Sequence, residues 1–196
     1  MLHAIVLTYD DGPSEVLTQT IIQLLEANKM KATFFMLGHK LQQNEEIVSA
    51  LLAAGHEVGS HSYWHLNAWC RSPLAVFRDV EQGLAAAGKL GATSLFRPPH
   101  GKITLASILQ VLIRKLTLAW WTIDSSDTWV NPIPVEQIID QIRREGGGVI
   151  LMHDHERVND PERKDYVITL TKMIIRFART EGYKIVPFGE LYSAYD

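Results

Sequence analysis

Two short groups of residues in this sequence have the types and spacing needed to bind a metal ion. Asp10 and Asp11 stand side by side before Gly12-Pro13, and His61 and His65 are four residues apart. Two neutral imidazoles and one carboxylate make a three-ligand site that leaves positions open for water and substrate. Two neighbouring carboxylates raise the pKa of one of them unless a cation separates their roles. With one carboxylate on the metal, the other would be free to act as a base.

Each group taken alone also has an ordinary structural interpretation. An Asp-Asp-Gly-Pro sequence is typical of a turn with helix-capping acids, and a histidine pair can serve packing or hydrogen bonding. The two groups together favour a metal site. They do not identify the metal, because zinc suits hydrolysis whereas two histidines and one carboxylate also describe non-haem iron oxygenases.

A third group contains a permanent cation beside a rigid loop. Arg97 is followed by Pro98-Pro99, and its forked guanidinium could hold a carboxylate such as Asp10 in the ionised form. The prolines stiffen the loop, so a following backbone N–H could be preorganised for an oxyanion. The alternative is a surface arginine beside a proline turn.

The remaining groups could supply a proton donor. His153 ends an apolar segment, where its imidazole could protonate a leaving group. A carboxylate bonded to it would raise its pKa and fix its tautomer, and Asp124 and Asp127 are the candidates. A strand-end histidine with a structural role is the alternative. His155 has no identifiable partner and is expected to be structural or exposed.

These groups follow short apolar segments that alternate with helical patterns. Strands are predicted at residues 4–9, 31–38, 57–61, 94–97, 116–123, 148–152 and 183–186, and helices at 14–28, 45–54, 73–88, 104–115, 134–144, 163–180 and 188–195. Strict alternation predicts a parallel sheet covered by helices. A full eight-fold barrel typically needs ~250 residues, so 196 residues favour a distorted (β/α) barrel of about seven parallel strands in one domain, residues 1–196. All five polar groups would then meet at the carboxyl ends of the strands.

Composition narrows the class of protein. A hydrophobic content of 46% with 21% charged residues predicts a folded domain. The net charge of −3 gives no reason to expect a nucleic acid or a membrane as partner. The single cysteine, Cys70, excludes an intramolecular disulfide and an all-thiolate zinc site. No signal-peptide pattern is found at the start, so the chain is expected to be cytoplasmic or a trimmed form of an exported protein.

In this order, the five groups resemble the motifs of the polysaccharide deacetylase (NodB-homology) family, from about Ile5 to about Val186. The resemblance implies a distorted (β/α) barrel and one divalent metal ion, with zinc expected first and cobalt, manganese or nickel as alternatives. It also implies hydrolysis of N- or O-acetyl groups on carbohydrates, so an acetylated carbohydrate is the expected partner.

The first two motifs of the family assign roles to four residues. The segment from Thr8 to Pro13 matches the first motif, which makes Asp10 the catalytic base and Asp11 a metal ligand. The second motif makes His61 and His65 the other two ligands.

The other motifs assign the remaining roles. By resemblance, Arg97 orients the base, the backbone N–H of His100 helps to bind the oxyanion, Leu151 lines the pocket for the acetyl methyl group, and His153 is the general acid. His100 departs from the family, which usually has Tyr at that position.

The fourth motif also departs from the family, because Thr128 separates Asp127 from Trp129. The resemblance still makes Trp129 a wall of the substrate groove, one residue later than in the family. Because of this departure, the motif allows either Asp124 or Asp127 as the partner of His153. Asp127 is preferred.

The expected activity is metal-dependent removal of acetyl groups from an N-acetylated carbohydrate of the chitooligosaccharide or peptidoglycan type. An O-acetyl (xylan-type) esterase and a related C–N hydrolase acting on a small amide are the alternatives. A carbohydrate-binding module on an inactive scaffold is disfavoured because Asp10 and His153 are both present. An iron oxygenase has no evident use for Arg97 or His153.

Overall fold

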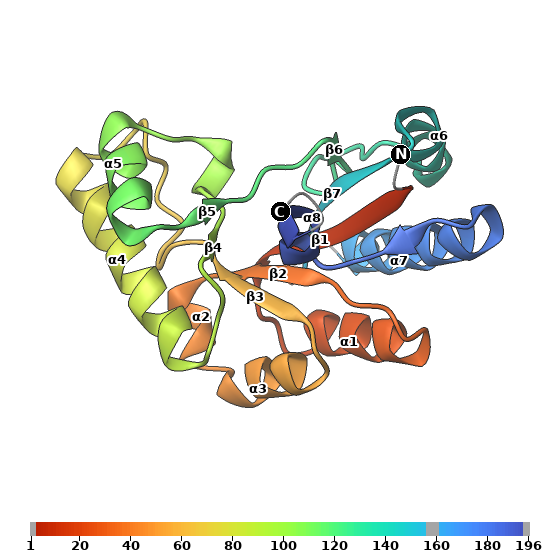
Figure 1. The fold of residues 1–196 in the computed structure, drawn as a ribbon, viewed down its shortest axis with the longest axis horizontal. Helices are drawn as coiled ribbons and strands as arrows, with labels where there is room; N and C mark the ends of the chain where they lie inside the picture. The colour runs from red at the N-terminus through yellow and green to blue at the C-terminus, as the bar shows by residue number, and fades with distance from the viewer. Residues whose placement is uncertain (1–2, 156–160, 194–196) are drawn as a thin grey trace.

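Strands and helices alternate along the chain, as Figure 1 shows for the computed structural model, which describes residues 3–155 and 161–193. The strands are β1 (Ala4–Gly12), β2 (Thr33–Met36), β3 (Glu57–Ser60), β4 (Leu95–Phe96), β5 (Thr117–Leu118), β6 (Ile123–Asp124), β7 (Gly147–His153) and β8 (Lys184–Ile185). The helices are α1 (Leu17–Ala27), α2 (Gly38–Leu41), α3 (Glu45–Ala53), α4 (Pro73–Lys89), α5 (Leu105–Arg114), α6 (Val135–Glu145), α7 (Pro161–Glu181) and α8 (Phe188–Ser193), with a short 3₁₀ turn at Pro99–Gly101.

All strand pairs are parallel. The order across the sheet is β5-β4-β3-β2-β1-β7-β6, and β8 pairs with the start of β1. The sheet curls into a distorted α/β barrel with most of its helices on the outside (Figure 1). This confirms the predicted fold class. Among the described residues, no helix is both long enough and apolar enough to cross a bilayer.

The prediction of one strand over residues 116–123 is wrong. This segment forms two strands, of which β5 pairs with β4 and β6 pairs with β7. Trp120 and Trp121 lie between these two strands and belong to neither. A continuous apolar run can form one strand, or two short strands in different parts of the sheet with a connecting segment between them, and the sequence pattern does not distinguish the two. The four-residue helix α2 was also not predicted, because it is too short to show a helical period.

The two sides of β1 show how the barrel positions the site. Ile5, Leu7 and Tyr9 pack in the core between the sheet and its helices. Val6 packs instead in a second core, inside the barrel, together with Phe188 of α8. Successive strand residues point to opposite faces, so Thr8 and Asp10 share the inner face with Val6. This places the carboxylate of Asp10 inside the barrel, at the carboxyl ends of its strands.

Candidate active site

A bulge at the end of β1 presents two adjacent carboxylates to the same pocket. In the pairing with β2, Asp10 lies opposite Phe35 and Gly12 lies opposite Met36, so Asp11 is the extra residue. Neighbouring side chains on a regular strand would point apart, and a bulge re-aims one of them. The backbone of Asp11 adopts a φ of 71°. Strained conformations of this kind often mark functional sites.

The loop after β3 is held by α4. His65 and Ser62 both have positive φ values, 60° and 68°. The buried carboxylate of Asp79 accepts hydrogen bonds from the backbone N–H groups on both sides of His65, at 2.7 and 3.4 Å. Gly83 lies so close that a Cβ there would be 2.3 Å from the Ser62 backbone. Asp79 and Gly83 therefore fix the loop that carries the histidines, and sequence reasoning did not find them.

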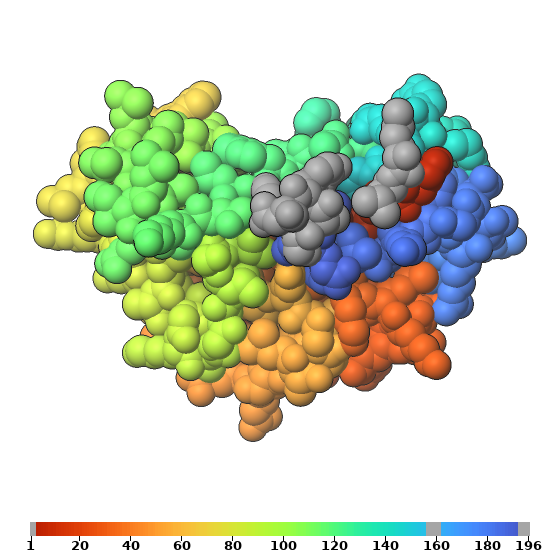
Figure 2. Space-filling model, in the orientation of Figure 1, coloured from red at the N-terminus to blue at the C-terminus, as the bar shows by residue number. Residues whose placement is uncertain are grey.

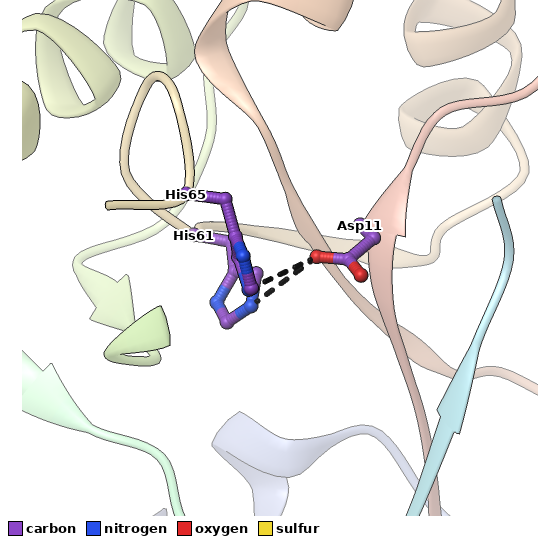
Figure 3. A group of neighbouring side chains, drawn as sticks. All are labelled: Asp11, His61 and His65. Carbon is purple, nitrogen blue, oxygen red and sulfur yellow. Dashed lines mark ion pairs between the residues drawn. The ribbon is translucent and has the colours of Figure 1, made fainter. Parts of the chain in front are cut away.

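Asp11, His61 and His65 point toward one another (Figure 3). Oδ1 of Asp11 lies 3.6 Å from Nε2 of His61 and 3.4 Å from Nε2 of His65. Nδ1 of His61 is 2.7 Å from the carbonyl oxygen of Arg97. A carbonyl can only accept, so Nδ1 carries the proton and Nε2 presents a lone pair. Burial, with the nearby His61, lowers the pKa of His65 to about 3, so His65 is neutral near pH 7.

These three residues fit a divalent cation. Their candidate ligand atoms all lie within 4.8 Å of one another. In the described part of the chain, the buried Oδ1 of Asp11 has no hydrogen-bond donor. Lone pairs that converge without a proton between them repel unless a cation binds them. Two imidazole nitrogens and one carboxylate oxygen are a donor set that suits zinc and other first-row metals.

Arg97 holds the second carboxylate. Its guanidinium is fully buried, and Nη1 donates to Oδ1 of Asp10 at 2.7 Å and to Oγ1 of Thr8 at 2.8 Å. The guanidinium also lies 4.1 Å from the centre of the Phe35 ring, a favourable cation–π arrangement. Burial lowers the pKa of Arg97, and Asp10 opposes that shift. A guanidinium stays charged in proteins, so Asp10 is oriented by a fixed cation.

His153 is paired with Asp127. Its Nδ1 lies 2.8 Å from Oδ1 of Asp127, and its backbone N–H donates to Oδ2 of the same carboxylate at 2.8 Å. Burial lowers the pKa of His153, but the hydrogen bond and charge of Asp127 outweigh burial and raise it to about 8. Asp124 is exposed, and its carboxylate accepts from the backbone N–H of Ser126. The structure therefore places Asp127, not Asp124, against His153.

A pocket of about 460 Å³ joins these groups at the carboxyl ends of the strands. Its lining residues are Asp10, Asp11, His61, His65, His100, Gly101, Lys102, Trp121, Asp124, Thr128, Leu151 and His153. Lys102, Trp121 and Thr128 were not among the predicted site residues. Trp129 does not line this pocket, and its side chain is 67% exposed. Thr128 lines the pocket in place of Trp129, so the expected role of Trp129 as a groove wall is not supported.

His155 lies beside the metal-ligand candidate Asp11, which sequence reasoning missed. Its Nδ1 is 3.3 Å from Oδ2 of Asp11, and its Nε2 is 3.2 Å from Nη1 of Arg163. Burial lowers its pKa to about 4. The sequence feature that could have placed His155 in the site is its position two residues after His153, because residues i and i+2 of an extended segment share a face.

Asp154 supports the turn at the end of β1 that carries Asp10 and Asp11. It is fully buried, Oγ1 of Thr18 donates to its Oδ2 at 2.6 Å, and its backbone N–H donates to the carbonyl of Asp10 at 3.0 Å. A Cβ on Gly12 would lie 2.3 Å from the Asp154 carboxylate. Burial raises the pKa of Asp154 to about 7. Nζ of Lys40 donates to the carbonyl of Asp11 at 2.7 Å and completes the support.

Comparison with known proteins decides the family. The sequence profile of the family described as polysaccharide deacetylase matches residues 3–116. The chain belongs to the polysaccharide deacetylase family. This confirms the expected family, and with it carbohydrate deacetylation as the class of reaction.

Two relatives and one solved structure show the extent of the likeness. The polysaccharide deacetylase described here is 33% identical to a peptidoglycan-N-acetylglucosamine deacetylase of Bacillus cereus, over 95% of this chain and 87% of the relative. It is 30% identical to the peptidoglycan-N-acetylglucosamine deacetylase PgdA of Listeria monocytogenes, over 96% of this chain but only 38% of that longer protein. A family 4 carbohydrate esterase from Streptomyces lividans, solved with acetate, superimposes with a TM-score of 0.79 at 29% identity, covering 93% of this chain and 91% of the esterase.

Proposed function

We propose that this polysaccharide deacetylase is a divalent-metal-dependent hydrolase that removes acetyl groups from N-acetylated glucosamine units of a glycan, of the chitooligosaccharide or peptidoglycan type. The observation that carries the proposal is the convergence of the lone pairs of Asp11, His61 and His65 beside Asp10 and His153 in one pocket. The described strands all join one sheet, which supports a single catalytic domain over residues 1–196.

Asp11, His61 and His65 would hold the metal ion, with zinc as the first candidate. When bound, a divalent ion at this position polarises the acetyl carbonyl and lowers the pKa of a water molecule. The remaining residues supply proton transfer and orientation.

Asp10 acts as the base that takes a proton from the attacking water. Arg97 holds one oxygen of Asp10, which orients the carboxylate and leaves the other oxygen for the proton. The backbone N–H of His100 stabilises the negative charge that develops on the carbonyl oxygen. Leu151 is buried and lines the pocket, where it gives the acetyl methyl group an apolar contact.

His153 protonates the leaving nitrogen as the C–N bond breaks. The pKa of about 8 keeps this imidazole protonated near neutral pH. An amine leaves poorly unless it is protonated, so a protonated His153 favours an N-acetyl over an O-acetyl substrate. The Bacillus cereus relative, whose name specifies N-acetylglucosamine, supports the same choice.

Acetate release from three substrates tests the proposal. The metal-loaded protein is given N-acetyl-chitooligosaccharides, peptidoglycan and acetyl-xylan, and p-nitrophenyl acetate serves as an ester whose leaving group needs no proton. We expect release from the N-acetylated glycans, and a loss of about 10²–10⁴-fold on them in His153→Gln with a much smaller loss on the aryl ester. Release from acetyl-xylan alone would assign an O-acetyl esterase, and no release from any glycan would contradict the proposal.

A further inference from the structure

Helix α5 turns its apolar side to solvent. Five of its residues, spaced three or four apart or adjacent, lie on the exposed side and are named here the α5 stripe: Leu105, Ile108, Leu109, Leu112 and Ile113. Leu105 is 86% exposed and Ile113 is 67% exposed. The buried residues of α5 are Ser107, Gln110 and Val111, of which two are polar. The usual pattern of a surface helix is the reverse.

Specific hydrogen bonds to α4 fix this orientation. The amide of Gln110 donates to Oε1 of Glu81 at 2.7 Å and to the carbonyl of Phe77 at 3.2 Å. Arg114 also bonds to Glu81. The polar side of α5 is therefore satisfied inside the protein, and rotation of the helix would break these bonds. Exposed Leu74 and Phe77 of α4 extend the apolar surface.

Lysines flank the α5 stripe along the chain on both sides, and the acidic Glu81 of α4 is paired with Arg114. No Asp or Glu occurs in residues 82–123, which contain five basic residues, one of them the buried Arg97, whereas the rest of the chain has 14 basic and 22 acidic residues. Lys102 lies before α5, and the exposed Lys115 lies directly after it. Helices α4 and α5 stand together at the end of the molecule away from α6 and α7 (Figure 1), and the green α5 segment forms part of the outer surface there (Figure 2).

We propose that this face docks on the surface of a lipid bilayer that contains anionic lipids. An apolar helix face with basic flanks suits the boundary between head groups and acyl chains, and each basic residue near the surface adds attraction to anionic lipids. The expectation that the protein has no membrane partner rested on the net charge of the whole chain. Because the lysines beside α5 lie apart from most of the acidic residues, the net charge of the whole chain does not describe this face.

A second copy of the chain fits this face less well. A ten-residue helix is about 15 Å long and 10–12 Å across, and Leu74 and Phe77 add only two apolar side chains to it. This surface is small beside the roughly 800 Å² that each partner buries in a stable interface. An antiparallel pairing of two α5 helices would also bring the Lys102 end of one beside the Lys115 end of the other. Like charges would meet at both ends, whereas anionic lipid would neutralise them.

Docking through α5 would hold the catalytic pocket close to the bilayer. Gly101 and Lys102 line the pocket, and α5 begins three residues after Lys102. The pocket would then lie within about the length of α5, ~15 Å, of the lipid surface. The inference does not depend on the proposed reaction, because the α5 stripe itself lies outside the pocket.

Vesicle flotation tests the inference without any substrate. The protein is mixed at low salt with vesicles of phosphatidylcholine and phosphatidylglycerol in equal amounts, or of phosphatidylcholine alone. We expect at least ten-fold more protein to float with the anionic vesicles, and less as salt is raised, because salt screens the basic flanks. The double variant Leu109→Gln, Leu112→Gln should lose at least ten-fold of this binding. The matched control Val16→Gln, at an exposed valine before α1, should bind as wild type.

Three results would overturn the inference. One is wild-type protein that does not float with anionic vesicles, and another is a double variant that floats as well as wild type. Light scattering during size-exclusion chromatography gives the third: a wild-type dimer that the double variant converts to a monomer would assign the α5 stripe to a second copy. Unchanged thermal unfolding of the double variant shows that its fold is intact.

Discussion

Asp127 accepts two hydrogen bonds from His153, one from the ring Nδ1–H and one from the backbone N–H, each 2.8 Å long. The carboxylate can only accept, so it fixes the ring tautomer with the proton on Nδ1. Nε2 is then the ring atom free to exchange a proton with a substrate. One buried carboxylate thus sets the tautomer, the orientation and the charge of the proposed acid.

Replacing Asp127 should weaken the acid in a specific way. In Asp127→Asn the burial of His153 remains, the charge of Asp127 is gone, and only the charges of Asp10 and Asp11 still oppose burial, so the pKa of His153 should fall below about 8. The alkaline limb of the rate–pH profile should move to lower pH by the same amount. NMR titration of the metal-free protein checks the pKa, and an unchanged pKa would contradict this account of the pair.

The His153 pair also links stability to pH. The folded-state pKa lies above the unfolded value, so the pair stabilises the fold fully below about pH 6.5 and the contribution is lost as pH rises through about 8. Asp127→Asn should remove this part of the pH dependence, which urea unfolding at several pH values would show.

Asp10→Asn tests whether Asp10 is the catalytic base and not a metal ligand. The amide oxygen can still accept from Arg97, so the fold should be retained, but the amide cannot take a proton from water. We expect turnover to fall by at least about 10²-fold while the protein binds its metal as wild type does. Metal content by mass spectrometry is the deciding measurement, since loss of the metal would mean that the roles of Asp10 and Asp11 are exchanged.

His155→Ala should weaken metal binding. The His155 ring lies 3.3 Å from the oxygen of Asp11 that faces away from the other two histidines, so it restrains the carboxylate. Groups that orient a ligand typically contribute 10–100-fold in metal affinity. Competition with a chromophoric chelator measures the affinity for zinc. An affinity equal to wild type would show that His155 does not position Asp11.

Asp154→Asn should change how stability depends on pH. The folded pKa of about 7 lies above the ordinary 3.8, so the folded state holds the proton longer and loses stability as pH rises from about 4 to 7. The loss is on the order of a few kcal/mol. An uncharged Asn removes this loss. In urea unfolding of the metal-free protein, the free energy of unfolding of the variant relative to wild type should therefore increase as pH rises from about 5 to 8. The control Asp165→Asn, at an exposed position, should show the wild-type slope, and an Asp154→Asn slope equal to wild type would contradict the prediction.

Residue types and periodicity were sufficient to predict the fold and the convergence of Asp11, His61 and His65. Parallel strands end at one edge, so residues at five strand ends had to meet there. The adjacent Asp10 and Asp11 were harder to place, because on a regular strand they would point apart. The bulge that brings them together is a backbone feature that the sequence pattern does not show.

Other parts of the site depend on contacts that no local pattern carries. Asp79 and Asp154 act through backbone groups from distant segments, and nothing near them in sequence marks that role. Trp129 lies outside the pocket and is exposed, after the turn in which Ser126 has a φ of 53°. For α5 the periodicity predicted a helix correctly, but it could not tell that the apolar side faces outward.

Acetate release as a function of bound metal tests the central claim most directly. The protein is stripped with a chelator, reloaded separately with zinc, cobalt or manganese, and assayed on N-acetyl-chitooligosaccharides while bound metal is counted. We predict that the stripped protein is inactive, that release returns in proportion to metal up to one ion per chain, and that His65→Ala recovers neither binding nor release. Full acetate release by the metal-free protein, or by His65→Ala, would contradict the claim.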